Sequence, residues 1–459
     1  MTENKITQGN IRKEIFFFFI PIVISAFFQH FYTIVDGIIV GQCLGDQAFA
    51  AVGGSAAKLI TMLINFFVGM SAGITVYTSQ FFGRADLNSV KKIIYNGFVS
   101  FVVFALLLAS IGLFLSVNYL KLMNTPENTM NYSIVYLNTF LVGLIFCVLY
   151  NLFSGIFRAI GDAKTPLYVL IFCSILNILF DLLFVAVFPW GVFGVAFATL
   201  LSQGISAIIL GGILYKKFKQ EKIAYALDRE MIKGIFKLGI PTGIQSIMYS
   251  LSNMLVQSTI NTFGAVTVTA WSAYLKIDGI VDVFSTALGS TVVTFVGQNL
   301  GAAKIERVKK AVNNTIFISY SIIFVVVVGL FAFRFPMLRM FSDNNEVVQL
   351  ASSFFYVVMP MYLLGIPNSI CSQAVRGLGK SFKPMIMSLV GVVGLRFFWV
   401  LVIFPADPTI HFLATCYPVS GVIMSIVFVC YYKYELQKTT KSMGNYSGIL
   451  LHSKLQFNR

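Results

Sequence analysis

Long apolar segments fill most of the chain and are separated by short polar connections. A helix that crosses the hydrocarbon core of a bilayer needs about 20 apolar residues, and lipid leaves no alternative partner for its backbone polar groups. The pattern therefore predicts an all-α, polytopic membrane protein with twelve transmembrane helices. Their expected ranges are 14–40, 47–80, 91–117, 130–155, 165–188, 191–215, 234–260, 270–297, 310–332, 348–373, 384–404 and 409–432.

Composition excludes a water-soluble protein of this length. Hydrophobic residues make up 57% of the 459 positions and charged residues only 11%, against about 25% charged in soluble domains. The net charge of +15 does not indicate a nucleic-acid-binding module, because the basic residues are dispersed among the connections. We expect the lipid bilayer, and no nucleic acid, as a partner.

The placement of lysine and arginine predicts the orientation. Of the 33 basic residues, 27 lie before the first span, around the connections that follow even-numbered spans, or in the tail, and only Lys121, Arg334 and Arg339 lie in the opposite connections. Basic connections are retained in the cytoplasm. Both termini are therefore expected to be cytoplasmic.

The two halves of the chain repeat each other. This duplication predicts two pseudo-symmetric six-helix bundles: an N-terminal lobe (1–215), a cytoplasmic linker (216–233), a C-terminal lobe (234–432) and a cytoplasmic tail (433–459). Parallel repeats of this kind suit a transporter whose lobes rock about a central cavity. At an offset of 218 the matched pairs are Arg158 with Arg376, Gly161 with Gly379, Pro166 with Pro384 and Gly83 with Gly301; at neighbouring offsets they are Pro21 with Pro241 and Gly45 with Gly264.

Four polar side chains inside the predicted spans converge on one depth. Asn177 precedes Asp181 by one helical turn, and Thr199 lies as far after Trp190 as Asp181 lies before it, roughly 13 Å below the hairpin tip. Asp36 is near the same end of the first span. A buried carboxylate is a candidate functional group, so Asp36, Asn177, Asp181 and Thr199 form the candidate cation-coupling site.

Three interpretations of this site remain open. The oxygens of Asp36, Asn177, Asp181 and Thr199 suit Na⁺, or one carboxyl could carry a proton because desolvation and mutual repulsion favour its neutral form. Alternatively, Asn177 and Asp181 only form hydrogen bonds with neighbouring helices. His30, about one and a half turns before Asp36, is a possible proton shuttle or a packing residue.

Charges also occur in the second half. Lys276, Asp278 and Asp282 share one predicted span, and Arg396 lies in another. With two charges of each sign they either neutralise one another or form a secondary charged site. The Gly69-x-x-x-Gly73 pair indicates close helix packing.

No enzymatic motif accompanies these spans. Gly379-Lys380-Ser381 resembles the end of a phosphate-binding loop, but the glycine required five residues earlier is Ala374, and no strand precedes it. We expect neither an enzyme nor a cofactor, and a transport process driven by an ion gradient or by the solute itself.

An ordered set of residues resembles the multidrug and toxic compound extrusion (MATE) family, and the MepA-like and DinF-like bacterial branch in particular. The resemblance extends to about residue 432. The residues are Pro21, Gln29, Tyr32, Val35-Asp36, Gly41, Leu44-Gly45 and Ala50-Ala51 in the first half, and Pro241, Gly264, Gly297-Gln298 and Gly301-Ala302 in the second.

The resemblance implies a multi-pass transporter of the bacterial cytoplasmic (inner) membrane, expected to be monomeric, that exports drug-like or cationic compounds in exchange for H⁺ or Na⁺. Asp36, Asn177, Asp181 and Thr199 match the coupling residues of one branch, and Pro21 matches a proline about which the first helix bends. The acidic residues that a second branch carries in its seventh and tenth spans are absent from this sequence. A flippase or exporter of lipid-linked sugars or metabolites is the alternative function.

Overall fold

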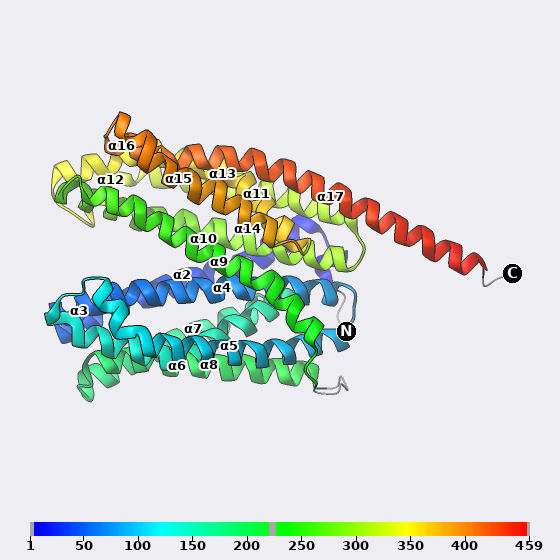
Figure 1. The fold of residues 1–459 in the computed structure, drawn as a ribbon, viewed down its shortest axis with the longest axis horizontal. Coiled ribbons are helices and arrows are strands. Elements are labelled where there is room, and N and C mark those ends of the chain that lie inside the picture. The colour runs from blue at the N-terminus through cyan, green and yellow to red at the C-terminus, as the bar shows by residue number, and fades with distance from the viewer. Residues whose placement is uncertain (1–3, 220–225, 457–459) are drawn as a thin grey trace. The chain divides into compact units, whose positions relative to one another are not determined.

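The computed structural model describes residues 4–219 and 226–456, with side chains described through residue 443, and nearly all of them are helical. No strand occurs among these residues, which confirms the all-α prediction. Figure 1 shows the long helices of each half lying lengthwise beside one another. The N-terminal half comprises α1 (Lys5–Gln8), α2 (Ile11–Leu44), α3 (Asp46–Gly53), α4 (Ser55–Gly83), α5 (Leu87–Leu122), α6 (Glu127–Ala159), α7 (Lys164–Asp181), η1 (Leu182–Val187) and α8 (Gly191–Phe218). The second half comprises α9 (Arg229–Asn261), α10 (Ala265–Gly301), α11 (Ile305–Ala332), α12 (Arg334–Arg339), α13 (Asn345–Gly377), α14 (Phe382–Ser388), η2 (Leu389–Gly394), α15 (Leu395–Phe398), η3 (Trp399–Ile403), η4 (Phe404–Ala406), α16 (Ile410–Ala414) and α17 (Cys416–Gln456).

Eleven helical segments in the described part of the chain are long and apolar enough to cross a membrane. Each overlaps one of the twelve expected spans. The remaining expected span, 234–260, falls on α9, which has 33 residues but includes Lys233 and Lys237 and a series of serines, asparagines and glutamines. Its length fits a membrane span, and its polarity separates it from the other eleven.

The backbone repeats as the sequence does. Gly161 and Gly379 have φ angles of 88° and 84°, and Ala85 and Ala303 have φ angles of 58° and 57°. Left-handed backbone is uncommon for alanine, so its recurrence at an offset of 218 shows that both halves use the same turn. The wide π-helical turns recur as well: η1 begins one residue after Asp181, and η3 begins at Trp399.

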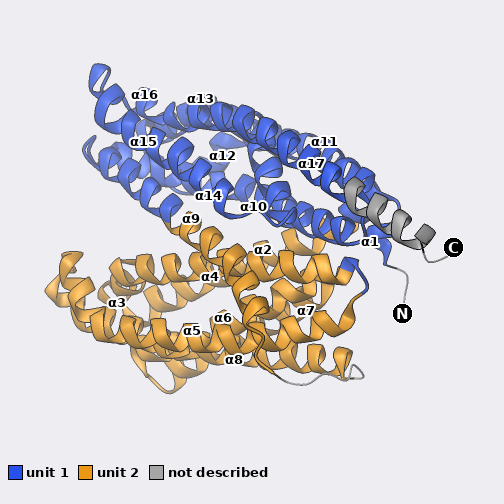
Figure 2. Cartoon of the chain, turned by 45° about the vertical axis from the view of Figure 1, so that its right-hand side comes forward, with its two compact units in different colours: residues 1–16, 83–85, 248–459 blue, residues 17–82, 86–247 orange. Residues whose placement is uncertain are grey.

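The chain divides into two compact units, coloured separately in Figure 2. Unit 2 comprises residues 17–82 and 86–247, and unit 1 comprises the described residues of 1–16, 83–85 and 248–459. The divisions fall within α2, at the end of α4 and within α9. Of the expected linker 216–233, residues 220–225 lie outside the described residues. Residues 433–443 of the expected tail continue α17, and residues 457–459 also lie outside the description.

Aliphatic and aromatic side chains of α4, α5, α6 and α8 form the main core of unit 2, including the fully buried Phe67, Phe101 and Phe157. Glycines bring α4 against the first half of α9. A Cβ atom on Gly69 would lie 2.8 Å from the Cα atom of Gly243, and one on Gly73 would collide with the backbone of Gly239. The packing role expected for Gly69 and Gly73 is confirmed.

Candidate functional site

Three of the four candidate coupling residues are contributed by two helices of unit 2. Asp36 lies on α2, and Asn177 and Asp181 lie on α7, where a separation of four residues places both on one face. Asp181 is fully buried and Asn177 is 2% exposed, whereas Asp36 is half-buried. A burial this complete is unusual for an aspartate without a cationic partner.

The carboxyl groups of Asp36 and Asp181 lie close enough to share a hydrogen bond when one of them holds a proton. As carboxylates neither can donate. When both groups are carboxylates, five buried side-chain atoms of the site have no hydrogen-bond partner. They are Asp36 Oδ1, both carboxylate oxygens of Asp181 and both polar side-chain atoms of Asn177. Buried polar atoms normally have one, so these oxygens are available to accept a proton or to coordinate a cation.

Thr199 of α8 is the fourth member of the set. Its hydroxyl group donates to the carbonyl of Val195 at 3.2 Å. The lone pairs of Thr199 Oγ1 therefore remain available as acceptors or ligands. Two carboxylates with an amide and a hydroxyl oxygen fit a monovalent cation, and the described residues contain no cluster of three His, Cys, Asp or Glu side chains that would suit a zinc site.

The helix changes its winding at Asp181. This residue ends the regular part of α7, and the π-helical turn η1 follows immediately. Wide turns of this type occur often at functional sites because they redirect side chains and loosen the backbone bonding. The residue at the corresponding position of the second half is Trp399. The wide turn is therefore duplicated, but the aspartate beside it occurs only in unit 2.

Two tyrosines complete the surroundings. Tyr136 of α6 lies near Asp36 and Asp181, and Tyr32 of α2 lies near Asp36. The sequence analysis included Tyr32 only through the family resemblance and did not identify Tyr136. Tyr136 is one tyrosine among 20 in the chain, and no spacing rule linked it to the acidic residues.

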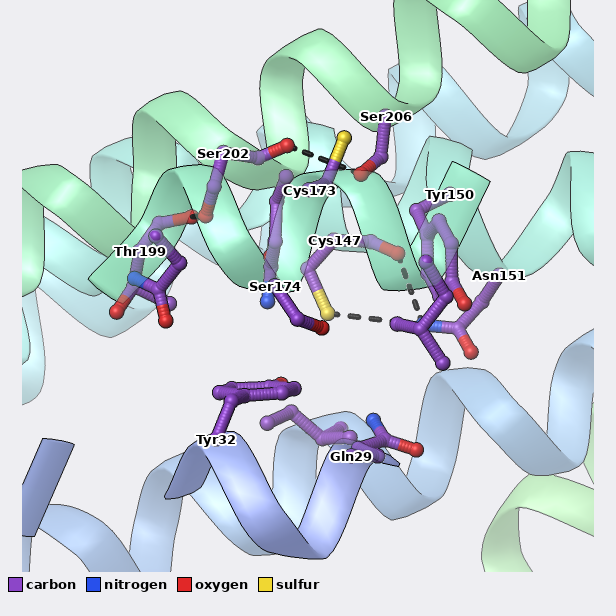
Figure 3. Close-up of a pocket in the computed structure, with 14 residues that line it drawn as sticks. Gln29, Tyr32, Cys147, Tyr150, Asn151, Cys173, Ser174, Thr199, Ser202 and Ser206 are labelled. Atoms are coloured by element: carbon purple, nitrogen blue, oxygen red, sulfur yellow. Dashed lines mark hydrogen bonds between the residues drawn. The ribbon is translucent and has the colours of Figure 1, made fainter. Parts of the chain in front are cut away.

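A pocket opens beside this group (Figure 3). It holds about 540 Å³ of empty space, its open mouth included, and is bounded by residues of α2, α4, α6, α7 and α8. Its wall combines aromatic rings, thiols, amides and hydroxyls and has no lysine or arginine. The lining residues are Gln29, Tyr32, Ile64, Cys147, Tyr150, Asn151, Leu170, Cys173, Ser174, Asn177, Thr199, Ser202, Gln203 and Ser206.

Two further predicted residues of α2 lie outside this pocket. His30 has an exposed side chain and is not among the lining residues. Pro21 lies within the helix and is buried. The hydroxyl group of Ser25 donates to the Pro21 carbonyl at 2.7 Å, and Pro21 itself has no backbone N–H to donate to the preceding turn.

Asp278 occupies a separate polar site in unit 1. The hydroxyl groups of Tyr274 and Tyr362 donate to its two carboxylate oxygens at 2.8 and 2.7 Å. Lys276 and Asp282 are on the same helix with exposed side chains. Asp278 therefore has phenolic donors as its partners.

Arg396 is 8% exposed and its partners are neutral. It donates to Asn253 Oδ1 at 2.8 Å, and its guanidinium carbon lies 4.4 Å from the centre of the Tyr417 ring. Asp278 is bonded to tyrosines and Arg396 to Asn253, so these two charged residues do not form a direct ion pair with each other. The neutralising pairs expected for the second-half charges are not formed by these two residues.

Comparison with known proteins identifies the family. A model of the MatE family matches residues 21–183 and 241–402, more than half of the chain. The chain belongs to the MatE family. Proteins of this family are membrane transporters and not enzymes, and the resemblance noted in the sequence is confirmed.

Relatives of this MatE protein match it along most of its length. YpnP of Bacillus subtilis (strain 168), a probable multidrug resistance protein, is 29% identical over 401 residues, 86% of this chain and 87% of YpnP. The multidrug export protein MepA of Staphylococcus saprophyticus is 21% identical over 398 residues, 84% of this chain and 86% of MepA. A solved MOP superfamily transporter from Pyrococcus furiosus matches with a TM-score of 0.87 at 21% identity, covering 96% of this chain and 99% of that one.

Proposed function

We propose that this MatE transporter is a secondary active antiporter. It exports lipophilic or cationic small molecules in exchange for H⁺ or Na⁺, which binds at Asp36, Asn177, Asp181 and Thr199. The observation that carries the proposal is the burial of Asp181, whose two carboxylate oxygens lack hydrogen-bond donors inside a membrane-spanning helix. Leaving such a group ionised and unpaired is costly.

Either ion would relieve this cost. A proton on one carboxyl would let Asp36 and Asp181 share a hydrogen bond, and a sodium ion would be coordinated by the acceptor oxygens of the four residues. Both ions bind the same group, so only one coupling site is required. The choice between them depends on conditions that vesicle experiments can impose.

The pocket supports exchange because it shares residues with the coupling site. Asn177 and Thr199 belong to both. A solute that contacts these side chains would compete with a cation for them, and this competition would link cation entry to solute release. The bending of α2 near Pro21 would accompany the exchange.

The pocket wall also supports the substrate class. Tyr32 and Tyr150 supply aromatic faces that attract lipophilic cations, and the relatives are named as multidrug proteins. The alternative function, a flippase or exporter for lipid-linked sugars or metabolites, would require basic residues around a phosphate-bearing cargo. No lysine or arginine lines the pocket, which favours the multidrug function.

Orientation and organisation complete the proposal. We propose a monomer in the bacterial cytoplasmic membrane with both termini in the cytoplasm and the lobe, linker and tail ranges given by the sequence. Within the C-terminal lobe, Lys276, Asp278, Asp282 and Arg396 form the candidate secondary charged site. His30 is a candidate proton shuttle for Asp36.

The decisive experiment measures efflux of ethidium from liposomes that contain the purified protein, with a pH gradient or a Na⁺ gradient imposed separately. We expect one gradient to drive transport, and Asp36→Asn and Asp181→Asn each to lower that gradient-driven rate at least tenfold. Asp46→Asn, which neutralises an exposed carboxyl group on α3, is the matched control. Gradient-driven rates at the wild-type level in both site variants would refute the coupling role.

A further inference from the structure

A second pocket is formed by residues of unit 1, whereas the coupling residues belong to unit 2. It is formed by the turn between α1 and α2 and by the first turns of α11, and it holds about 1060 Å³ of empty space, its open mouth included. Its lining concentrates cationic and amide side chains: Arg12, Arg307, Lys310, Asn10, Asn313 and Asn314. The proposed transport function uses none of them.

Arg307 is held in place by neutral acceptors. Its guanidinium group donates to Asn299 Oδ1 at 3.2 Å and to the carbonyls of Ile6 and Gly9 at 3.1 and 2.9 Å. Lys304 donates to the Thr7 carbonyl at 2.9 Å. These bonds hold α1 and the turn after it against α10 and α11. One wall of the pocket is therefore fixed in place by side-chain hydrogen bonds.

Within the described part of the chain, the other two pocket cations, Arg12 and Lys310, are not paired with carboxylates. Arg12 Nε donates to Asn314 Oδ1 at 2.8 Å, and Lys310 is exposed at the mouth. Among the described residues, ion pairs join Lys217 to Asp162 and Lys309 to Glu306, and neither pair includes a pocket cation. Two carboxyl groups lie nearby: Glu14 is beside Gly9, and Glu306, next to Arg307 in the chain, pairs with Lys309. The three pocket cations outnumber them.

The position of the pocket at the ends of membrane-spanning helices favours a lipid phosphate over a soluble phosphate as its ligand. Both α2 and α11 are membrane-spanning helices, and the pocket lies at their first turns. The Arg12 guanidinium group lies 5.6 Å from the centre of the Phe317 ring. From there Phe317, Tyr320 and Phe324 follow one face of α11 and are 61%, 40% and 56% exposed.

We propose that this pocket binds the phosphate headgroup of an anionic phospholipid. Arg12, Arg307 and Lys310 neutralise the phosphate, and the amides of Asn313 and Asn314 offer it hydrogen bonds. The acyl chains lie along the aromatic face of Phe317, Tyr320 and Phe324. Basic pockets at the ends of membrane helices are suited to such headgroups, because clustered lysine and arginine attract anionic lipid.

The test compares lipid retention by native mass spectrometry after the full-length protein is equilibrated with phosphatidylglycerol or with phosphatidylcholine. We expect a tightly retained phosphatidylglycerol molecule on the wild-type protein and none of equal affinity for phosphatidylcholine. Lys310→Glu should weaken phosphatidylglycerol binding by about fivefold or more, since each basic residue near an anionic surface contributes appreciably. Arg12→Gln combined with Lys310→Gln should weaken it further.

Lys383→Glu is the matched control, because Lys383 is exposed near the start of α14 and lies outside the pocket. It should bind phosphatidylglycerol as the wild-type protein does. Equal retention of both lipids by the wild-type protein, or unchanged phosphatidylglycerol binding by Lys310→Glu, would overturn the proposal. A third arm adds inorganic phosphate to the protein already loaded with phosphatidylglycerol: displacement of the lipid at comparable concentration would assign the pocket to a soluble phosphate instead.

Discussion

The carboxyl group of Asp181 in α7 meets the carboxyl group of Asp36 in α2, inside a helical unit where neither has a cationic side-chain partner. Two such groups should act as one binding site. We expect Asp36→Asn and Asp181→Asn each to lower the gradient-driven efflux rate by at least tenfold, about 1.4 kcal/mol, and the double variant to be no slower than the worse single variant. Rates from a double-mutant cycle in liposomes would measure this coupling. Losses that multiply would show two independent sites.

Tyr136 lies near both carboxyl groups, so its hydroxyl group should influence how strongly the coupling ion binds. We expect Tyr136→Phe to keep the maximal efflux rate and to shift the half-saturating ion concentration by about two- to tenfold, the order of one polar interaction near a buried carboxyl pair. Titration of transport against H⁺ or Na⁺ concentration would detect the shift. Tyr132→Phe, one turn earlier and 42% exposed, should behave as the wild-type protein, and an equal shift in both variants would contradict the assignment.

Asp278 depends on its two tyrosines for stability. Removing one phenolic donor from a carboxylate should cost about 1.5–3 kcal/mol, so Tyr274→Phe and Tyr362→Phe should each lower the thermal unfolding temperature of the purified protein. Tyr168→Phe, at a 64% exposed position, provides the reference. We expect ion-coupled efflux to persist in both site variants. If Tyr362→Phe instead abolished coupling and left the unfolding temperature unchanged, Asp278 would belong to a second coupling site.

The backbone contact between Gly73 and Gly239 leaves no room for a side chain. Gly73→Ala should therefore force α4 and α9 apart and reduce stability by about 1–3 kcal/mol, as overpacking does. Gly212→Ala in α8 meets nothing within 4 Å and should be neutral or stabilising by about 0.5–1 kcal/mol, because alanine favours the helix. Thermal unfolding of the two variants side by side tests the contrast. Equal stability would show that α4 and α9 adjust freely.

Much of this arrangement could be predicted from the sequence because periodicity and duplication are local signals. Four-residue spacing placed Asn177 and Asp181 on one face. The 218-residue offset paired Gly161 with Gly379, and the two glycines share a left-handed backbone conformation. The helix count was less secure, because the polar residues of α9 weaken its hydropathy signal although the helix is as long as its neighbours.

Contacts between helices distant in sequence could not be predicted in the same way. The placement of Tyr136 beside the acidic pair, and of Tyr362 on Asp278, depends on how helices rotate and pack. Neither tyrosine stands at a spacing that marks it among the others. The pocket at Arg12 and Lys310 could not be predicted for a different reason. Basic residues at cytoplasmic helix ends are expected from membrane orientation alone, so they do not indicate a binding site.

The grouping of residues 1–16 with the C-terminal unit, and of the first half of α9 with the N-terminal unit, bears on the history of the duplication. Each unit is completed by a stretch of chain that the other half of the gene encodes. A gene cut between the two repeats would produce fragments that each lack a piece of their own fold.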